Sequence, residues 1–276
     1  MGLRIMNNVE ALNAHRTLQM TNLQIGKSIE RLSSGLRINR AADDAAGLAV
    51  SEIMRSQIRG MNVASRNAQD GVSMVQVADG AISAVTDMLQ RMRDLAVQAA
   101  NGTFSDQQRA NLDAEVQQVV QELNRVGTDT EFNGIKILAG SIATAASAVT
   151  LQVGANGGQS IAFTISTVSA SDLGVSGIAV STAASASAAI ASLDAAINNL
   201  TTNRATLGAI QNRLEQTINR LGLTAENLQA AESRIRDADM AKEMIDFTKA
   251  QILQQSGTAM LSQANLAPQS VLSLLG

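Results

Sequence analysis

Apolar residues recur every seven positions along two long stretches of the chain. In the first stretch, residues 44–100, a second apolar series follows three residues after each member of the leading one, which is the a/d heptad pattern of a coiled-coil helix. At about 1.5 Å per residue the predicted helix is roughly 85 Å long, so it does not fit one compact globule. The leading series is Met61, Ala68, Val75, Ile82, Leu89 and Ala96.

The second heptad stretch, residues 186–235, carries a ladder of leucines. Arg204 and Gln211 interrupt its companion row, which we interpret as a device that sets register. Such a ladder fits either a dimeric zipper or a bundle within one chain. We favour an intramolecular antiparallel bundle, because the same chain carries a matching stripe at 61–99. The leucines are Leu193, Leu200, Leu207, Leu214, Leu221 and Leu228.

A shorter helix is predicted over residues 105–126. Ser105 and Gln108 have the spacing of a capping box, and an apolar stripe follows them. We expect Gly127 to end this helix, and Gly102, in a left-handed conformation, to end the long helix before it. Glycines inside the long helix cost helix stability, which close approach of another segment or a gentle bend would explain: they are Gly60, Gly71 and Gly80.

The middle of the chain, about residues 128–185, has β and loop character. Apolar and polar residues alternate over 149–153 and again over 161–165. The turn signal Asn156-Gly157-Gly158 between them predicts a β-hairpin. After residue 166 the chain is rich in Ser, Thr, Ala and Gly, so we expect an exposed loop.

The two ends of the chain carry amphipathic helical stripes with modest apolar faces. Neither end has a convincing partner inside one compact domain except the other, and a lone pair of such helices is marginally stable. We expect this region to become fully ordered only when neighbouring molecules cover its stripes. The stripe residues are Ile25, Ile29, Leu32, Leu36, Met240, Met244, Phe247 and Leu261.

The amino-acid composition excludes several kinds of chemical site. The 276 residues include one Pro, no Cys, and one His, His15, and the net charge is −3. These counts exclude disulfides, thiolate catalysis and multi-His metal sites, so we expect no cofactor, no metal and no enzymatic activity. An aromatic content of 1% and the slightly acidic charge argue against nucleic-acid binding. We interpret Asp43-Asp44 as a helix cap.

No stretch of 18 uninterrupted apolar residues is present, so we expect no membrane insertion. The first residues do not combine a basic region with an apolar one, and we therefore expect no cleaved secretory signal.

Several ordered blocks of sequence resemble bacterial flagellins. The likeness covers roughly residues 1–140 and 190–276, and the middle is much shorter than in many flagellins. At the N-terminal side the blocks are Ser33–Asn39, Asp43–Leu48, Leu89–Gln98 and Glu131–Gly134. At the C-terminal side they are Leu207–Leu214, Glu232–Asp237 and Gln263–Leu272.

The resemblance implies a mainly α protein, a long antiparallel coiled-coil bundle with a small β-hairpin region, that polymerises into the flagellar filament. Residues 1–42 with 236–276 would form the filament core, 43–140 with 186–235 the coiled-coil rod, and 141–185 a short outward-facing region. It also implies a secreted, extracellular protein of the bacterial flagellum, exported without a cleaved signal. Its implied partners are an export chaperone at the C-terminal segment and the hook-associated and cap proteins.

Flagellins of this type are also ligands of an innate-immune Toll-like receptor. Carried over from the resemblance, the recognition residues are Arg91, Leu95 and Glu115. The competing interpretation is that Arg91 and Glu115 are ordinary solvated helix residues.

Three alternatives remain at this point. A hook–filament junction protein would have similar ends. A signalling helical hairpin of the chemoreceptor kind would need a membrane anchor or sensor module. An enzyme is disfavoured because no nucleophile–base pair or metal site can be built from these residues.

Overall fold

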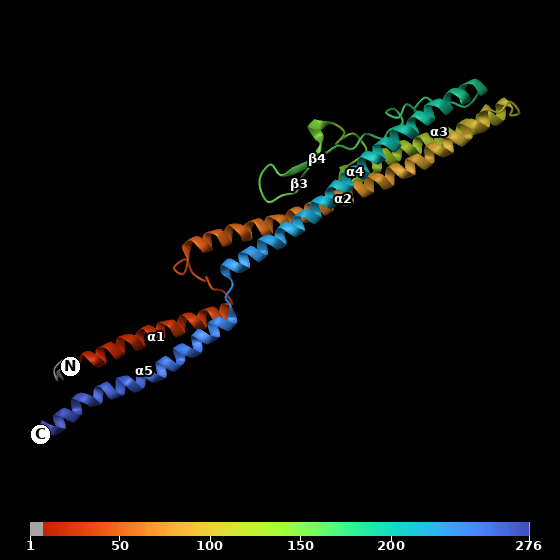
Figure 1. Ribbon diagram of the computed structural model, residues 1–276. Coiled ribbons are helices and arrows are strands. Elements are labelled where there is room, and N and C mark those ends of the chain that lie inside the picture. Colours follow the sequence, from red (N-terminus) through yellow and green to blue (C-terminus); the bar gives the residue numbers. More distant parts are fainter. Residues whose placement is uncertain (1–7, 276) are drawn as a thin grey trace. The chain divides into compact units, whose positions relative to one another are not determined.

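The computed structural model describes residues 8–275, without the side chains of Ala145 and of residues 267–275. Within that range the fold is mainly α, as predicted, with five α-helices and two small hairpins (Figure 1). The helices are α1 (Val9–Ser34), α2 (Ala45–Ala100), α3 (Asp106–Asp129), α4 (Ala183–Arg236) and α5 (Met240–Leu275). Between α3 and α4 lie β1 (Glu131–Phe132), β2 (Ile135–Lys136), η1 (Ala145–Ser147), β3 (Val149–Gln152) and β4 (Ser160–Phe163).

The chain forms two compact units. Residues 57–226 make up the central unit, and residues 1–56 with 227–276 make up the terminal unit. Helices α2 and α4 each contribute residues to both units, since α2 begins at Ala45 and α4 ends at Arg236.

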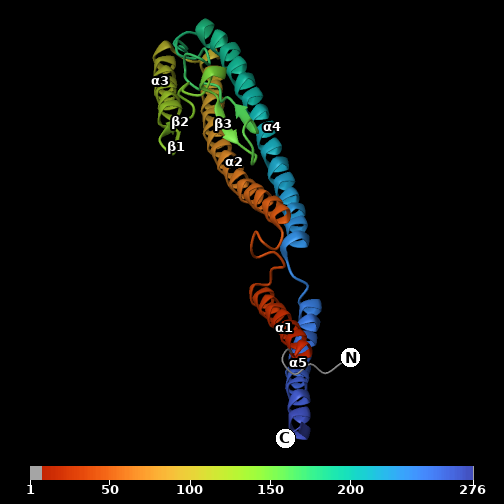
Figure 2. The same ribbon diagram turned by 90° about the vertical axis from the view of Figure 1, so that its left-hand side faces the viewer.

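In the central unit, α2, α3 and α4 lie side by side around one apolar core (Figure 2). Helices α2 and α4 are antiparallel, because Asp79 pairs with Arg204 and Arg93 pairs with Asp194. The heptad residues Val75 and Leu89 are completely buried in this core, and Ala68 is completely buried in a smaller cluster with Leu214. The seven-residue spacing therefore lines up one continuous apolar seam along each helix.

The end of α2 is held by an arginine and not by a left-handed glycine. Gly102 does not have positive φ. The buried Arg109 of α3 instead donates from Nε to the Ala99 carbonyl at 2.9 Å and from Nη2 to the Asn101 carbonyl at 3.1 Å. A cation near the last carbonyls satisfies acceptors that the helix itself leaves free. Ser105 and Gln108 form the predicted capping box at the start of α3.

The prediction that Gly127 ends α3 is wrong. The helix runs two residues further, to Asp129, and Gly127 is buried inside it. A Cβ atom at this position would clash with the carbonyl oxygen of Val168. Glycine is needed here because a loop from the middle of the chain crosses the helix at backbone distance.

The prediction of an exposed loop after residue 166 is also wrong. The segment is irregular, as expected, but apolar side chains spaced along it are buried in the core of the central unit. Side chains of α3 hold its backbone: Asn124 accepts from Ala170 N at 2.9 Å, and Asp113 accepts from Val180 N at 2.7 Å. The buried residues are Val168, Ala170, Leu173, Val175, Ile178 and Val180.

The predicted hairpin is present. Strands β3 and β4 pair antiparallel, with Val149 opposite Phe163 and Gln152 opposite Ser160. The hairpin explains two helix glycines, since a Cβ atom on Gly60 would lie 2.9 Å from the Ala155 Cβ, and one on Gly71 would overlap the Leu151 side chain. Gly80 has open space around it, so close approach of a segment of this chain does not explain it.

Candidate assembly and recognition surfaces

Helices α1 and α5 pair antiparallel in the terminal unit, and polar side chains make several of the contacts between them. Ser28 Oγ donates to Glu243 Oε1 at 2.7 Å, and Arg31 reaches the same carboxylate at 3.6 Å. Further along, Gln254 donates to Asn22 Oδ1 at 2.9 Å. The residues buried in this pair are small or polar: Thr21, Ser28 and Ala250.

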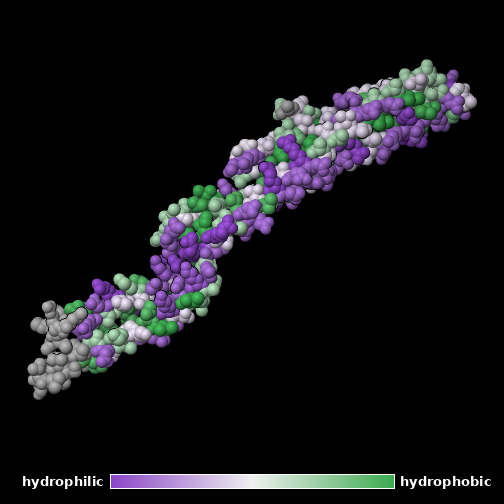
Figure 3. Space-filling model, viewed as in Figure 1, coloured by the Kyte–Doolittle hydropathy of each residue, from purple (hydrophilic) through white to green (hydrophobic). Residues whose placement is uncertain are grey.

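Large apolar side chains of α1 and α5 point instead to the surface. Leu23 is 72% exposed, although a leucine gains about 1.5–3 kcal/mol on full burial. Figure 3 shows hydrophobic side chains on the surface of the terminal helices, among hydrophilic ones. The exposed residues of the two helices are Val9, Leu12, Met20, Leu23, Ile29, Met240, Met244, Ile245, Ile252, Leu253, Met260 and Leu266. Such a surface is typical of a protein interface.

The structure divides the stripe residues predicted at the chain ends into two groups. Ile29, Met240 and Met244 are exposed. The others are half-buried: Ile25, Leu32, Leu36, Phe247 and Leu261. Sequence reasoning missed Leu23 and Ile245, which lie off the single stripe that it followed. Apolar residues on more than one face of each helix were the available signal.

Short segments connect these helices to α2 and α4 within the terminal unit. Arg37 N donates to the Arg236 carbonyl at 2.7 Å, and Ala238 N donates to the Gly35 carbonyl at 2.9 Å. The Arg236 side chain donates to Glu52 Oε1 at 2.7 Å, and this hydrogen bond lowers the pKa of Glu52. The helix-cap interpretation holds for Asp44, whose Oδ1 accepts from Gly47 N at 2.8 Å.

The three receptor residues implied by the resemblance have different positions. Arg91 of α2 and Glu115 of α3 are both accessible and form an ion pair, with Arg91 Nη2 2.6 Å from Glu115 Oε1. Leu95 is only 2% exposed and belongs to the apolar core of the central unit. Of the three residues, only the Arg91–Glu115 ion pair is therefore accessible at the surface, whereas Leu95 lies in the core.

Two further ion pairs join α2 to α4. Of their four residues, the sequence pattern indicates only Arg204. Arg204 Nε lies 2.8 Å from Asp79 Oδ1, so the residue that interrupts the leucine ladder's companion row has a partner on the facing helix. Arg93 Nε lies 2.7 Å from Asp194 Oδ1, and this hydrogen bond raises the pKa of Arg93. The partners of these pairs are 125 and 101 residues apart in the chain, so no local sequence pattern indicates them.

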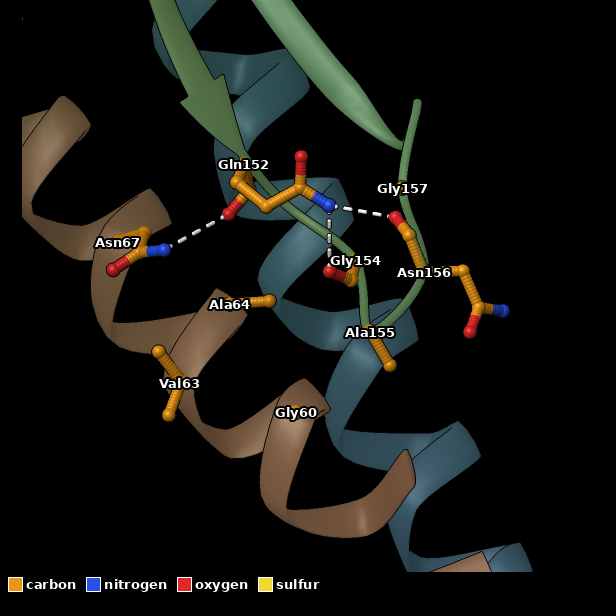
Figure 4. A pocket seen from close by; sticks show the side chains of 9 residues that line it. All are labelled: Gly60, Val63, Ala64, Asn67, Gln152, Gly154, Ala155, Asn156 and Gly157. Atoms are coloured by element: carbon orange, nitrogen blue, oxygen red, sulfur yellow. Dashed lines mark hydrogen bonds between the residues drawn. The ribbon is translucent and has the colours of Figure 1, made fainter. Parts of the chain in front are cut away.

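A cavity of about 300 Å³ lies between α2 and the turn of the β3–β4 hairpin (Figure 4). Asn67 Nδ2 donates to the Gln152 carbonyl at 3.0 Å, and Gln152 Nε2 donates to the Asn156 carbonyl at 2.7 Å. The Asn156 side chain points away from the cavity. The lining is glycine, alanine, valine, asparagine and glutamine, so it offers no acid, base or nucleophile.

Among the described residues, no cluster of His, Cys, Asp or Glu is arranged to hold a metal ion. Within the same part of the chain, no helix is long and apolar enough to span a bilayer.

Long antiparallel helices, and a terminal pair that leaves many large apolar side chains exposed, are typical of a helical protein with interaction surfaces. Residues 5–143 match the bacterial flagellin N-terminal helical region, and residues 190–275 match the bacterial flagellin C-terminal helical region. The chain belongs to the bacterial flagellin family. It is a structural protein that polymerises into the flagellar filament, which serves motility.

Relatives match over their full length. The chain is 52% identical to the flagellar filament 33 kDa core protein of Treponema phagedenis, over 98% of this chain and 99% of the relative. It is 50% identical to a flagellin of Halalkalibacterium halodurans, with the same coverage. A putative flagellar hook-associated protein from Vibrio parahaemolyticus shares the fold, with a TM-score of 0.59 at 13% identity over 71% of this chain and 100% of that one. Flagellin, and not a junction protein, is therefore the identity that the sequence supports.

Proposed function

We propose that the exposed apolar surfaces of α1 and α5 form the principal contacts between subunits in the filament. The observation that carries this proposal is the inverted burial of the terminal pair: Thr21 and Ser28 are buried while Leu12 and Leu23 are exposed. A surface of this kind has a lower free energy when other copies cover it. In this proposal residues 1–42 with 236–276 are the filament core, 43–140 with 186–235 the rod, and 141–185 the outward-facing region.

Polymerisation follows from contacts between different patches on successive subunits. Such heterologous contacts give an open helical filament when the rotation between subunits does not close into a ring. The buried heptad seam keeps the central unit rigid. The ladder leucines from Leu193 to Leu221 and the facing heptad residues from Met61 to Leu89 are buried, so they support assembly indirectly, by maintaining the subunit's shape. Leu228 is half-buried and belongs to the terminal unit.

The proposal is tested by comparing Leu23→Ser with Leu23→Met in seeded polymerisation. The serine variant removes apolar surface at an exposed position, whereas methionine keeps it at similar volume. We expect the serine variant to raise the critical concentration for growth at least several-fold, and the methionine variant to behave like the unmodified chain. Equal growth of both variants, with circular dichroism showing both folded, would overturn the proposal.

We further propose that the export chaperone covers the C-terminal part of α5 before assembly. Ile252, Leu253 and Met260 are exposed there, and a chaperone that masks them would keep subunits from associating early. The same end surfaces are the candidate contacts for hook-associated and cap proteins, which flank the filament. Chaperone binding to full-length protein, measured by titration calorimetry, should be lost in Ile252→Ser/Leu253→Ser and kept in Leu12→Ser.

The receptor proposal is that unassembled subunits bind a host Toll-like receptor through Arg91 and Glu115. Both side chains are accessible and charged, so they offer directional contacts, while buried Leu95 would act by holding α2 in place. In a receptor-reporter assay, Arg91→Ala and Glu115→Ala should each weaken the response about tenfold or more. Arg125→Ala is the matched control, because Arg125 forms a similarly exposed pair with Glu122 on α3. If the response is unchanged in Arg91→Ala and Glu115→Ala, then Arg91 and Glu115 are ordinary solvated helix residues and not recognition residues.

A further inference from the structure

We propose that the terminal unit carries a methionine oxidation site that controls assembly, formed by the exposed thioethers of Met20, Met240, Met244 and Met260. Two-electron oxygen donors, such as hydrogen peroxide or hypochlorous acid, would modify these residues in the unassembled subunit. The effect on assembly rests on the proposed function, in which the surfaces of α1 and α5 form subunit contacts.

Composition makes methionine the main oxidisable side chain. The chain has 11 Met but no Cys, Trp or Tyr, and one His. Cysteine thiolates react first with peroxides where a protein has them, and here none competes. An oxidant that meets this subunit therefore reacts at methionine sulfur, and accessibility decides which one.

Accessibility separates the methionines by unit. The four proposed targets are 46–65% exposed and all belong to the terminal unit. In the central unit, Met61, Met74 and Met92 are at most 6% exposed. Met54 and Met88 are half-buried, and Met1 and Met6 lie outside the described residues. The molecule thus contains an internal comparison between accessible and protected sulfurs.

The targets lie on the surface that the proposed function uses. Met240 and Met244 are four residues apart on α5, so they share one face of that helix. Leu23, which is also exposed, lies three residues beyond Met20 on α1 and therefore on the same face of that helix. Ile245 of α5 is exposed as well. Oxidation therefore alters the same apolar surface that neighbouring subunits would cover.

The chemistry is a single oxygen-atom transfer. A lone pair on the methionine sulfur attacks one peroxide oxygen, the O–O bond breaks, and water leaves after proton transfer. The sulfur is oxidised by two electrons and the peroxide is reduced by two. The sulfoxide is polar and accepts hydrogen bonds, so burying it in an apolar interface without a donor is unfavourable. Sulfoxide reductases, which use a dithiol, reverse the change.

The test treats full-length unassembled protein with limiting hydrogen peroxide and measures sulfoxide at each methionine by peptide mass spectrometry. We expect Met20, Met240, Met244 and Met260 to oxidise at least tenfold faster than Met61, Met74 and Met92. Seeded polymerisation of the oxidised protein should slow at least several-fold and recover after treatment with both sulfoxide reductases. Comparable oxidation rates at exposed and buried sulfurs would refute the site.

A variant with all four residues changed to Leu should polymerise and stay insensitive to peroxide. The matched control, Met54→Leu/Met88→Leu, should remain sensitive. If the fourfold variant loses assembly after peroxide as the unmodified chain does, the proposal is wrong. A second measurement does not depend on the variant. After partial oxidation of the unmodified chain, sulfoxide at the four residues should be enriched in the unpolymerised fraction. Equal amounts of sulfoxide in filament and supernatant would refute control of assembly.

Failure of the oxidation proposal can be distinguished from failure of the proposed function. If Leu23→Ser polymerises normally without oxidant, the contact surface itself is wrongly assigned. If that variant fails as expected while oxidised protein still assembles, only the oxidation proposal fails.

Discussion

Individual glycines in the helices have different roles, which depend on what lies next to their missing Cβ atoms. Gly127 faces the backbone of the segment that crosses α3, whereas Gly80 faces open space on α2. Both are helical, so the intrinsic helix preference of alanine over glycine applies to both. The difference between them is therefore due to packing alone.

Replacing Gly127 by Ala should destabilise the protein by about 1–3 kcal/mol, because the Val168 backbone must move. Replacing Gly80 by Ala should stabilise the isolated subunit by up to about 1 kcal/mol, because only helix propensity changes. Chemical denaturation of the two variants measures both effects. Equal shifts of the same sign would contradict the close approach at Gly127.

Glu52 should make stability depend on pH. The hydrogen bond from Arg236 lowers the pKa of Glu52 in the folded protein below its ordinary 4.5. Its stabilising contribution is therefore fully present above that value and is lost as pH falls through the folded pKa. The unmodified chain should be more stable than Glu52→Gln at pH 7.

Thermal unfolding of both proteins between pH 7 and pH 3 checks this expectation. The difference in melting temperature should shrink towards the acid end and vanish once Glu52 is protonated in both states. A difference that is constant over the whole range would show that the charge of Glu52 is not what stabilises the contact with Arg236.

At the scale of elements, the helices have unequal support. The core that joins α2, α3 and α4 contains residues of the central unit only. In α1 and in the part of α5 whose side chains are described, only Thr21, Ser28 and Ala250 are buried. Each terminal helix therefore depends on the other, whereas the central helices do not depend on them.

Deleting residues 250–276 should remove helix from α1 as well as from α5, and should leave the melting of the central unit nearly unchanged. The physical reason is that isolated helices are marginal in water without tertiary packing. Hydrogen exchange resolved by peptide gives the answer for each element. Persistent protection of Val9–Ser34 in the truncated protein would show that α1 does not need its partner.

At the scale of the whole molecule, polymerisation is a process that covers apolar surface. Most of the exposed large apolar residues belong to the terminal unit, which is the smaller of the two. Removing apolar surface from water is favourable, and it also lowers the heat capacity of the system. Assembly should therefore stabilise the ends of the chain more than it stabilises the central unit.

Amide exchange should slow in α1 and α5 when subunits enter filaments, by at least tenfold, while the buried core positions of α2 and α4 change little. Comparison of exchange in unassembled and assembled full-length protein measures this. Protection in α1 and α5 that is already complete in the free subunit would contradict the expectation that neighbours complete their order.

Local patterns in the sequence determined the helices and the hairpin. The heptads, the Ser105–Gln108 capping box and the turn at Asn156-Gly157 act between residues at most seven apart, so they can be recognised without knowing the fold. The resemblance to flagellins added Arg91, Leu95 and Glu115 as candidate recognition residues.

Only the tertiary structure decided which surfaces are covered. Position 127 requires glycine because the backbone of Val168, about forty residues later, crosses the helix there. Apolar side chains from Val168 to Val180 pack into the core of the central unit, and α3 accepts hydrogen bonds from the backbone of Ala170 and Val180. Leu95 is buried and Leu23 is exposed, although both are leucines in amphipathic helices. Burial depends on contacts between residues distant in the chain, and no local pattern contains that information.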